Sequence, residues 1–343
     1  MKLTYDGLIF EDNSFAIYNR ELILAIDKLG VDISLAAWGQ GRDSGIQIEE
    51  RLLELMDKPR YRNIWLRHSW PKCDPYYDAK YNWSTINARI KIGLTFWESE
   101  KLPDEWIDEM QCVDYIIIAT KKTKETFINN GIEEDKIKIV PGGVNLDKFN
   151  PNRIPVNIDT NKSFKFLHLG WAQPRKGTDV LIKAFSEEFT NKDDCCLVIK
   201  SPIGDWFAKV PNPNIIYDIG IANDISGYYS SCNCAVYPTL LEGFGLYILE
   251  CFASKLPIII TQEGCYRDFV TEDNAILINS ERKPYTYVTP GFGNYPDKEH
   301  LKYLMREAYE NPNTSKSDRA YKDVQDWTWE KAALKFQKEF KDV

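Results

Sequence analysis

Short hydrophobic runs alternate with segments of helical periodicity along most of the chain. In the first half, residues 18–29 carry apolar side chains at helical spacing and stop at Gly30. Asn13 and Ser14 precede this segment as a polar turn and a candidate helix cap. Runs rich in β-branched and aromatic residues predict strands at residues 3–5, 31–36, 63–66, 90–96, 115–119 and 136–140, and a second helix is predicted at residues 120–129.

A polar stretch divides the chain near its middle. Residues 146–163 contain Asp147 and Asn150-Pro151-Asn152, a composition typical of an interdomain linker. The alternation then restarts, with strands predicted at residues 165–169, 196–200, 215–217, 234–237 and 257–261, a helix at 179–189 and a charged helical tail at 318–343. Two βαβ series indicate an α/β protein with two doubly wound domains. Because such sheets bind ligands beyond the carboxyl ends of their strands, we expect those ends to meet at one cleft.

Composition restricts the classes of partner. Of 343 residues, 43% are hydrophobic and 27% charged, which is typical of a globular protein. No apolar run approaches the roughly 18 residues of a membrane span, and the first residues lack the apolar core of a secretory signal, so we expect a cytoplasmic protein. A net charge of −8 disfavours nucleic acid as a partner. It also disfavours firm attachment to an anionic membrane, although peripheral contact stays open.

Cysteine and histidine spacing gives no metal pattern. The eight cysteines form no Cys-x-x-Cys pair, and the Cys195-Cys196 and Cys232-x-Cys234 spacings do not suit zinc. We therefore predict reduced thiols and no bound metal. Of the three histidines, His168 lies between leucines on a predicted strand and is interpreted as a core residue, His300 follows a charged run and is interpreted as a surface residue, and His68 follows a strand.

The segment that follows the predicted strand at residues 234–237 carries two acidic residues around a glycine loop. It reads Pro-Thr-Leu-Leu-Glu242-Gly-Phe-Gly-Leu-Tyr-Ile-Leu-Glu250, and a helix is predicted to begin near Leu246. Gly243 and Gly245 allow close backbone approach to a ligand, and the helix N-terminus suits a phosphate. Glu242 and Glu250 can accept hydrogen bonds from sugar or ribose hydroxyls. The alternative is a glycine turn with two solvated glutamates.

A basic loop follows the predicted strand at residues 165–169. It reads Gly170-Trp-Ala-Gln-Pro-Arg175-Lys176-Gly177, and a helix is predicted from about Thr178. Two cations where a loop meets a helix can neutralise a diphosphate leaving group as negative charge develops on it. The alternative is an exposed basic turn.

The two loops together resemble the retaining GT-B glycosyltransferases, in particular glycosyltransferase family 4. Three further segments, 140–151, 225–238 and 327–330, resemble the interdomain segment, the approach to the acidic motif and the final helix of that family. The resemblance implies two Rossmann-like domains facing across a cleft. They would be an acceptor-binding domain at residues 1–150, with a C-terminal helix at about 327–343 packing back on it, and a donor-binding domain at residues 164–326.

The resemblance also implies a role for each residue of the donor wall. Glu250 would bind the donor ribose, Glu242 the hydroxyls of the sugar, and Lys176 with Arg175 the diphosphate. The backbone N–H groups of Phe244, Gly245 and Leu246 would reach sugar or phosphate. The remaining donor-side residues are Gly170, Trp171, Lys200 and Gly243. The donor would be a UDP- or GDP-sugar, and the reaction would retain anomeric configuration without a cofactor or metal. The acceptor would be a glycan, a lipid-linked sugar or a protein.

The chain departs from the family pattern at three places. Trp171 stands where many relatives have arginine after the glycine of the first loop. No histidine lies in the first-domain loop that touches the sugar in many relatives, so Trp97 or Glu98 would face the sugar, unless Glu98 is a helix-capping carboxylate. The usual glycine turn after the first strand is replaced by residues 11–14, which leaves Asn13 and Ser14, with His68, as the acceptor-side candidates.

Two other functions fit the same architecture. One is a nucleotide-sugar epimerase or a phosphorylase, because fold alone does not separate these activities from transfer. The other is a sugar-nucleotide-binding protein with weakened catalysis, which Trp171 and the missing histidine motivate.

Overall fold

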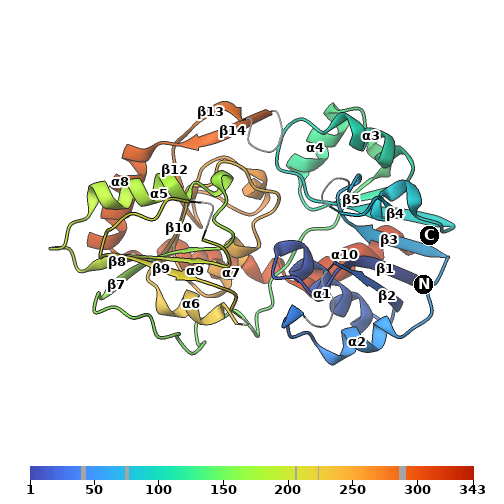
Figure 1. Ribbon diagram of the computed structural model, residues 1–343, viewed down its shortest axis with the longest axis horizontal. Coiled ribbons are helices and arrows are strands. Elements are labelled where there is room, and N and C mark those ends of the chain that lie inside the picture. The colour runs from blue at the N-terminus through green and yellow to red at the C-terminus, as the bar shows by residue number, and fades with distance from the viewer. Residues whose placement is uncertain (40–43, 74–76, 205–206, 223, 286–290) are drawn as a thin grey trace. The chain divides into compact units, whose positions relative to one another are not determined.

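The computed structural model describes residues 1–39, 44–73, 77–204, 207–222, 224–285 and 291–343. The chain divides into two compact units. Unit 1 comprises residues 1–143 and 327–343, and unit 2 comprises residues 144–326. Each unit contains a six-stranded parallel sheet with helices packed against it (Figure 1). The predicted α/β class with two doubly wound domains is therefore confirmed.

Unit 1 contains the first parallel sheet, with strand order β2-β1-β3-β4-β5-β6. The strands are β1 (Lys2–Leu8), β2 (Asp32–Trp38), β3 (Ile64–His68), β4 (Ile90–Leu94), β5 (Tyr115–Ile118) and β6 (Ile137–Ile139). The helices are α1 (Ser14–Lys28), α2 (Glu50–Met56), α3 (Asp104–Gln111), α4 (Lys121–Asn129) and α10 (Trp329–Phe340), with short 3-10 turns η2 (Ala79–Tyr81), η3 (Trp83–Thr85) and η4 (Glu134–Lys136).

The C-terminal helix α10 packs on α1, as expected for a final helix that returns to the first domain. The rings of Tyr18 and Trp329 meet edge to face with centroids 5.1 Å apart. A Cβ atom on Gly143 would lie 2.4 Å from the backbone of Thr328, so the chain leaves unit 1 and re-enters it at adjoining points. The first and the last residues of the chain thus both fold into unit 1.

Unit 2 contains the second parallel sheet, with strand order β12-β11-β10-β7-β8-β9, and a separate antiparallel hairpin. The sheet strands are β7 (Phe164–Leu169), β8 (Cys195–Ser201), β9 (Ile215–Ile219), β10 (Cys234–Tyr237), β11 (Ile258–Thr261) and β12 (Ile276–Ile278), and the hairpin is β13 (Ser280–Tyr285) with β14 (Gly291–Pro296). The helices are α5 (Thr178–Glu188), α6 (Ser226–Ser231), α7 (Leu246–Ala253), α8 (Lys298–Glu310) and α9 (Ser315–Asp323), with 3-10 turns η5 (Pro174–Lys176), η6 (Cys265–Asp268) and η7 (Val324–Asp326).

The core of unit 2 lies between its sheet and the helices α5 and α8. Phe185 of α5 and Leu301 of α8 are fully buried in one cluster with Phe166, Leu197 and Val236 of the strands. His168 is also buried, as predicted. Its Nδ1 bonds the carbonyl of Val236 at 2.8 Å and its Nε2 bonds Thr178 Oγ1 at 2.9 Å. Because burial disfavours its charged form, the pKa of His168 falls to about 4.

The segment predicted as a linker, residues 146–163, falls within unit 2, which begins at Val144. The backbone of Val156 contacts α6: its N–H lies 3.4 Å from the Gly227 carbonyl, and its carbonyl accepts from Ser231 Oγ at 2.8 Å. Arg153 donates to Ser226 and pairs with Asp224 at 2.6 Å. This polar segment therefore packs on unit 2, and the N-terminal part of unit 1 ends at Gly143.

Candidate functional site

The two loops singled out in the sequence follow adjacent central strands of unit 2. β7 pairs with β10, β8 and β9 continue outward from β7, and β11 and β12 continue outward from β10. The order of strands reverses between β7 and β10, and such a switch point is where doubly wound sheets bind ligands. Residues 170–177 after β7 and residues 238–245 after β10 thus share the position expected for a ligand site.

The two loops touch through their backbones. Gly177 adopts a left-handed conformation, with φ of +68°, where it caps α5. A Cβ atom at this position would lie 1.9 Å from the carbonyl oxygen of Pro238. A side chain does not fit there, so the glycine allows the approach that brings Lys176 beside the second loop.

Lys176 and Glu242 form an ion pair across the two loops. Their side chains are 13% and 8% exposed, so the pair is largely shielded from water. Arg175 Nη1 lies 3.8 Å from the other carboxylate oxygen of Glu242 and 3.3 Å from the carbonyl of Leu241. Burial raises the pKa of Glu242, but the charges of Lys176 and Arg175 outweigh that effect and lower it from its ordinary value. Glu242 is therefore ionised at neutral pH.

Tyr247 completes this group, although the sequence motifs did not single it out. Lys176 Nζ lies 4.9 Å from the centroid of the Tyr247 ring, within the range of a cation–π contact. The same ring packs on Tyr237 with centroids 4.0 Å apart. Burial raises the pKa of Tyr247, and the charge of Glu242 adds to the effect. The available signal was an aromatic residue in the first turn of the helix predicted at Leu246.

Helix α7 begins at the acidic loop as predicted. Gly245, with φ of +93°, precedes its first residue Leu246 and leaves the first-turn N–H groups without side-chain capping. Gly243 N–H donates to Glu242 Oε1 at 3.2 Å. Phe244 is buried against Phe269, with ring centroids 5.3 Å apart, so this residue can offer its backbone to a ligand while its side chain anchors the loop.

Glu250 lies further along α7 and is buried. The hydroxyl of Tyr229, on α6, donates to Glu250 Oε2 at 2.5 Å. Burial raises the pKa of Tyr229, and the charge of Glu250 adds to this shift, so the phenol stays protonated as a donor. The carboxylate of Glu250 is therefore held in a defined orientation.

Lys200 lies near the carboxyl end of β8, and its ammonium group donates hydrogen bonds to other groups of the protein. Its Nζ donates to Asp218 Oδ1 and to the carbonyl of Gly220, both at 2.9 Å. Tyr228 donates to the second oxygen of Asp218. Burial raises the pKa of Asp218, but these hydrogen bonds and the Lys200 charge outweigh it and lower the pKa. Gly170 N–H bonds the carbonyl of Lys200 at 3.0 Å, and Trp171 beside it is half-buried.

Three acceptor-side candidates gather at the carboxyl ends of β1 and β3, which are neighbours at the switch point of the other sheet. Asn13 caps α1 by accepting from Ala16 N–H at 3.0 Å, as predicted, and Ser14 is exposed. His68 is fully buried and stacks on Phe15 with ring centroids 4.6 Å apart. Its Nδ1 is hydrogen-bonded to Oδ1 of Asn19. Burial lowers the pKa of His68. Its imidazole therefore packs within the unit.

Trp97 and Glu98 follow β4. Trp97 is buried in an aromatic cluster, where its ring centroid lies 4.5 Å from that of Trp106 and its Nε1 donates to the Lys101 carbonyl at 3.0 Å. Glu98 is half-buried, and the N-cap of the following helix α3 is Pro103. Trp97 thus serves packing, and Glu98 is the member of this pair with a more accessible side chain.

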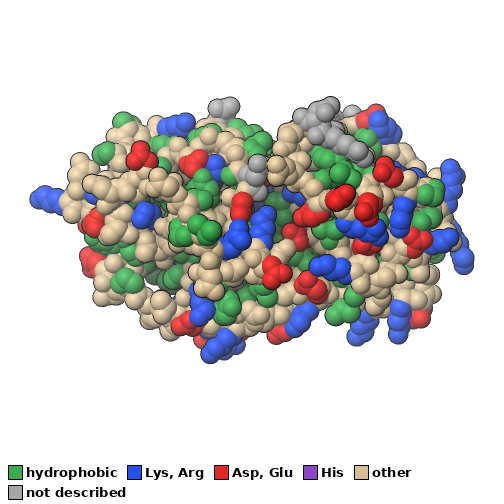
Figure 2. Space-filling view, turned by 90° about the horizontal axis from the view of Figure 1, so that it is seen from below, with side chains coloured by type: hydrophobic (Ala, Val, Ile, Leu, Met, Phe, Trp, Pro, Cys, Tyr) green, Lys and Arg blue, Asp and Glu red, His purple; other side chains and the backbone are tan. Residues whose placement is uncertain are grey.

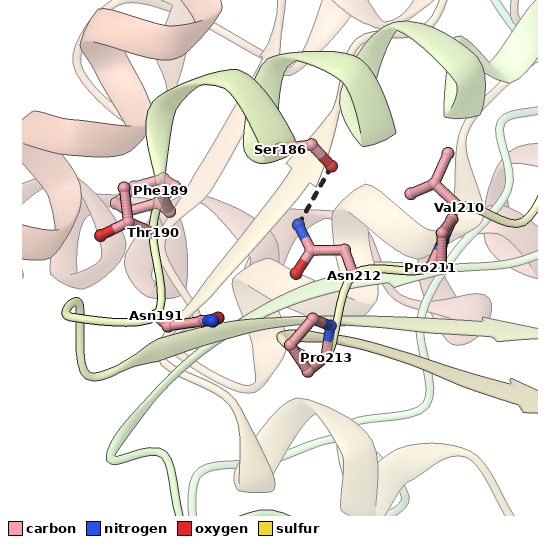
Figure 3. A pocket seen from close by; sticks show the side chains of 8 residues that line it. All are labelled: Ser186, Phe189, Thr190, Asn191, Val210, Pro211, Asn212 and Pro213. Carbon is pink, nitrogen blue, oxygen red and sulfur yellow. Dashed lines mark hydrogen bonds between the residues drawn. The ribbon is translucent and has the colours of Figure 1, made fainter.

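A pocket of about 450 Å³ lies elsewhere on unit 2 (Figure 3). It sits between the C-terminal end of α5 and the segment that precedes β9, at the amino ends of the strands. Asn212 points toward Ser186 across it, with the amide donating at 3.2 Å. The pocket is therefore separate from the switch point. Its lining residues are Ser186, Phe189, Thr190, Asn191, Val210, Pro211, Asn212 and Pro213.

Three general features bear on function. Within the described ranges, no group of three or more His, Cys, Asp or Glu side chains is placed to hold a metal ion. No helix of the described chain combines the length and apolarity needed to cross a membrane. On the face shown in Figure 2, Lys and Arg side chains lie interspersed with Asp and Glu, an arrangement unlike the basic stripe of a nucleic-acid-binding surface.

Comparison with solved structures identifies the architecture. Sucrose-phosphate synthase from Thermosynechococcus elongatus superposes with a TM-score of 0.67 over 99% of this chain and 98% of its own, at 13% identity. Anabaena Alr3699/HepE in complex with UDP-glucose superposes with a TM-score of 0.69 over 100% of both chains, at 12% identity. The chain has the GT-B fold.

Sequence comparison finds a family match for part of the chain. Residues 163–287, which include both loops of the candidate site, match the family described as Glycosyl transferases group 1. D-inositol 3-phosphate glycosyltransferase 2 of Catenulispora acidiphila is 22% identical over 270 residues, which are 69% of this chain and 63% of that protein. D-inositol 3-phosphate glycosyltransferase of Mycobacterium sp. (strain KMS) is 25% identical over 251 residues, which are 64% and 56%. The chain thus spans less than two thirds of the length of these relatives.

Proposed function

We propose that this protein is a retaining glycosyltransferase that moves a sugar from a nucleotide-diphosphate sugar to a hydroxyl group of a glycan, lipid-linked or protein acceptor. The observation that carries the proposal is the pairing of Lys176 with Glu242 at the β7–β10 switch point. A cation beside a carboxylate matches a donor in which a diphosphate adjoins a hydroxyl-bearing sugar. The match to Glycosyl transferases group 1 covers this site, and a solved structure of the same fold contains UDP-glucose.

Each donor contact follows from the chemistry of its side chain. Lys176, with Arg175 behind it, would neutralise the diphosphate, and the N-terminus of α7 would add backbone N–H groups. Glu242 would accept hydrogen bonds from the sugar, and Glu250, oriented by Tyr229, would accept from the ribose. Lys200 already bonds Asp218, so its part in donor binding would be to order the loop that begins at Gly170.

The reaction would proceed on one face of the donor sugar. The bond between the anomeric carbon and the diphosphate oxygen breaks, and the diphosphate keeps the electron pair. The acceptor oxygen bonds the anomeric carbon from the same face, and its proton passes to the departing diphosphate. Lys176 offsets the negative charge that develops on the leaving group, which is the step where electrostatic stabilisation contributes most.

A panel of UDP- and GDP-sugars tests the proposal. A thermal-shift screen identifies the donor, since a bound ligand raises apparent stability. NMR of the products then reports configuration. We expect transfer or slow donor hydrolysis with retention, lost in Glu242→Ala and kept in Glu272→Ala, an exposed glutamate of the same unit. Inversion of the donor sugar at C2 without an acceptor would indicate an epimerase, and binding without turnover a catalytically weakened protein; either result overturns the proposal.

A further inference from the structure

The β13–β14 hairpin is separate from the parallel sheet of unit 2. It pairs in antiparallel register from Ser280 opposite Pro296 to Tyr285 opposite Gly291, and in the chain it follows the last sheet strand, β12, and precedes α8 (Figure 1). Residues 281–284 of β13 are exposed. Its contacts with the rest of the unit involve the loop after β10.

The hairpin is attached to the loop that carries Glu242. Asn294 of β14 donates its backbone N–H to the Leu240 carbonyl at 3.0 Å. Tyr285 of β13 is buried in a cluster with Leu240 and Leu241, and Tyr295 packs against the same cluster. Two residues before Glu242, the chain is therefore held by a hydrogen bond and by apolar contact from one side.

The first loop of the site holds the same two residues through backbone contacts. The N–H groups of Leu240 and Leu241 lie 2.7 and 3.4 Å from the carbonyl oxygen of Arg175. Leu240 is thus bonded through its N–H to the loop of Lys176 and through its carbonyl to the hairpin. Because Glu242 lies two residues after Leu240, both attachments bear on its distance from Lys176.

The side chain of Asn294 adds a second connection. Its Nδ2 donates to the Glu263 carbonyl at 3.2 Å, in the loop after β11. The Tyr266 hydroxyl also lies 3.1 Å from that carbonyl. One asparagine therefore joins two loops at the carboxyl edge of the sheet, the loop after β10 through its backbone and the loop after β11 through its amide.

We propose that Asn294 is a positioning residue for the transfer reaction and that the β13–β14 hairpin braces the Leu240–Leu241 segment so that Glu242 stays beside Lys176. The inference rests on the proposed function for its catalytic consequence. Catalytic groups need placement within a fraction of an ångström, and a misplacement of about 1 Å can cost roughly a hundredfold in rate. The brace acts on Glu242 through the backbone and makes no contact with the substrate.

The test compares Asn294→Ala with Phe292→Ala, an exposed position on the same strand. Asn294→Ala removes the bond to Glu263 and loosens β14 against the loop. We expect kcat to fall about tenfold or more, while the KM for the donor and the Kd for the nucleoside diphosphate change less than about twofold. Phe292→Ala should leave all three values unchanged, and Asn294→Gln, which keeps the amide donor, should recover part of the kcat.

Amide hydrogen exchange gives a readout that needs no activity. Exchange at Leu240 and Leu241 should accelerate in Asn294→Ala and not in Phe292→Ala. Unchanged exchange overturns the brace, as does a fall in kcat matched by equal losses of diphosphate affinity and melting temperature, which would indicate general destabilisation. If the wild type turns over no nucleotide sugar, the proposed function fails, and the exchange comparison alone decides whether the hairpin braces the loop.

Discussion

Lys176 and Glu242 neutralise each other across two loops that lie 66 residues apart in the sequence. The proposed roles separate them, with the lysine on the diphosphate and the glutamate on the sugar. A donor would therefore replace the ion pair, offering the lysine a phosphate and the glutamate hydroxyl groups. A nucleoside diphosphate without a sugar would satisfy the lysine and leave a buried carboxylate without its partner, which is unfavourable.

Glu242→Gln is predicted to affect the two ligands in opposite directions. The amide no longer neutralises Lys176 or repels the diphosphate, so UDP or GDP should bind about tenfold more tightly, a gain of ~1.4 kcal/mol. Turnover of the nucleotide sugar should fall, because the amide accepts hydrogen bonds from the sugar less strongly than a carboxylate. Isothermal titration calorimetry and a donor-hydrolysis assay measure the two effects.

Glu272→Gln is the matched control for this substitution. It removes one negative charge from an exposed position of the same unit and should change neither the affinity for UDP or GDP nor the turnover of the nucleotide sugar. Unchanged or weaker diphosphate binding in Glu242→Gln would contradict the competition between the carboxylate and the phosphate.

Lys176→Ala is predicted to weaken diphosphate binding by about 1.5–3 kcal/mol, the contribution of a hydrogen bond to a charged group. It also leaves the buried carboxylate of Glu242 with only Arg175, at 3.8 Å, to offset its charge, so the free energy of unfolding should fall. Lys183→Ala removes an exposed lysine of α5 as a control. Calorimetry and urea unfolding measure the two quantities, and diphosphate affinity equal to that of the control would exclude Lys176 as the phosphate ligand.

The parallel sheets could be predicted because their strands are short β-branched runs between helical segments. The start of α7 was predicted at Leu246 because Gly245, immediately before it, favours a loop over a helix. The β13–β14 hairpin was not predicted, since β13 carries the exposed charges Glu281, Arg282 and Lys283 and lacks the alternation of a half-buried strand. Its Tyr285 packs against Leu240 and Leu241, which are distant in sequence.

The residue types of the candidate site were predictable, but their pairing was not. The sequence indicates a basic loop and an acidic loop, whereas the adjacency of β7 and β10 that joins Lys176 to Glu242 is a property of the folded sheet. The same limit applies in unit 1. A histidine after a strand suggested a site residue, yet packing against Phe15 and its neighbours buries His68 completely.

Acid should destabilise the fold through its buried histidines. The pKa of His168 is lowered to about 4 by burial, and that of His68 is also lowered by burial, against an ordinary value of about 6.5. As pH falls below about 6.5, the unfolded chain gains protons that the folded chain does not bind, so the free energy of unfolding should fall toward pH 4 and show no contribution from these groups above about pH 7.

His168→Gln isolates this effect, because the amide can keep a donor and an acceptor near Val236 and Thr178 without titrating. Urea unfolding between pH 7.5 and 4.5 should show a shallower decline for this variant than for the wild type. Parallel curves for His168→Gln and the wild type would show that His168 makes no contribution.

Two glycines with left-handed backbones allow the cost of backbone strain to be measured apart from the cost of a steric clash. Gly131, with φ of +89°, has no atom within 4 Å of the position that an added methyl group would occupy, whereas a methyl group on Gly177 would meet the Pro238 carbonyl. Gly131→Ala should lower the free energy of unfolding by about 1–2 kcal/mol, the cost of this backbone region for a side chain, and leave diphosphate affinity unchanged. Gly177→Ala should lose more stability and also bind diphosphate more weakly, because the loops of Lys176 and Glu242 must move apart. Equal losses in the two variants, measured by urea unfolding and calorimetry, would show that the contact between the loops is not tight.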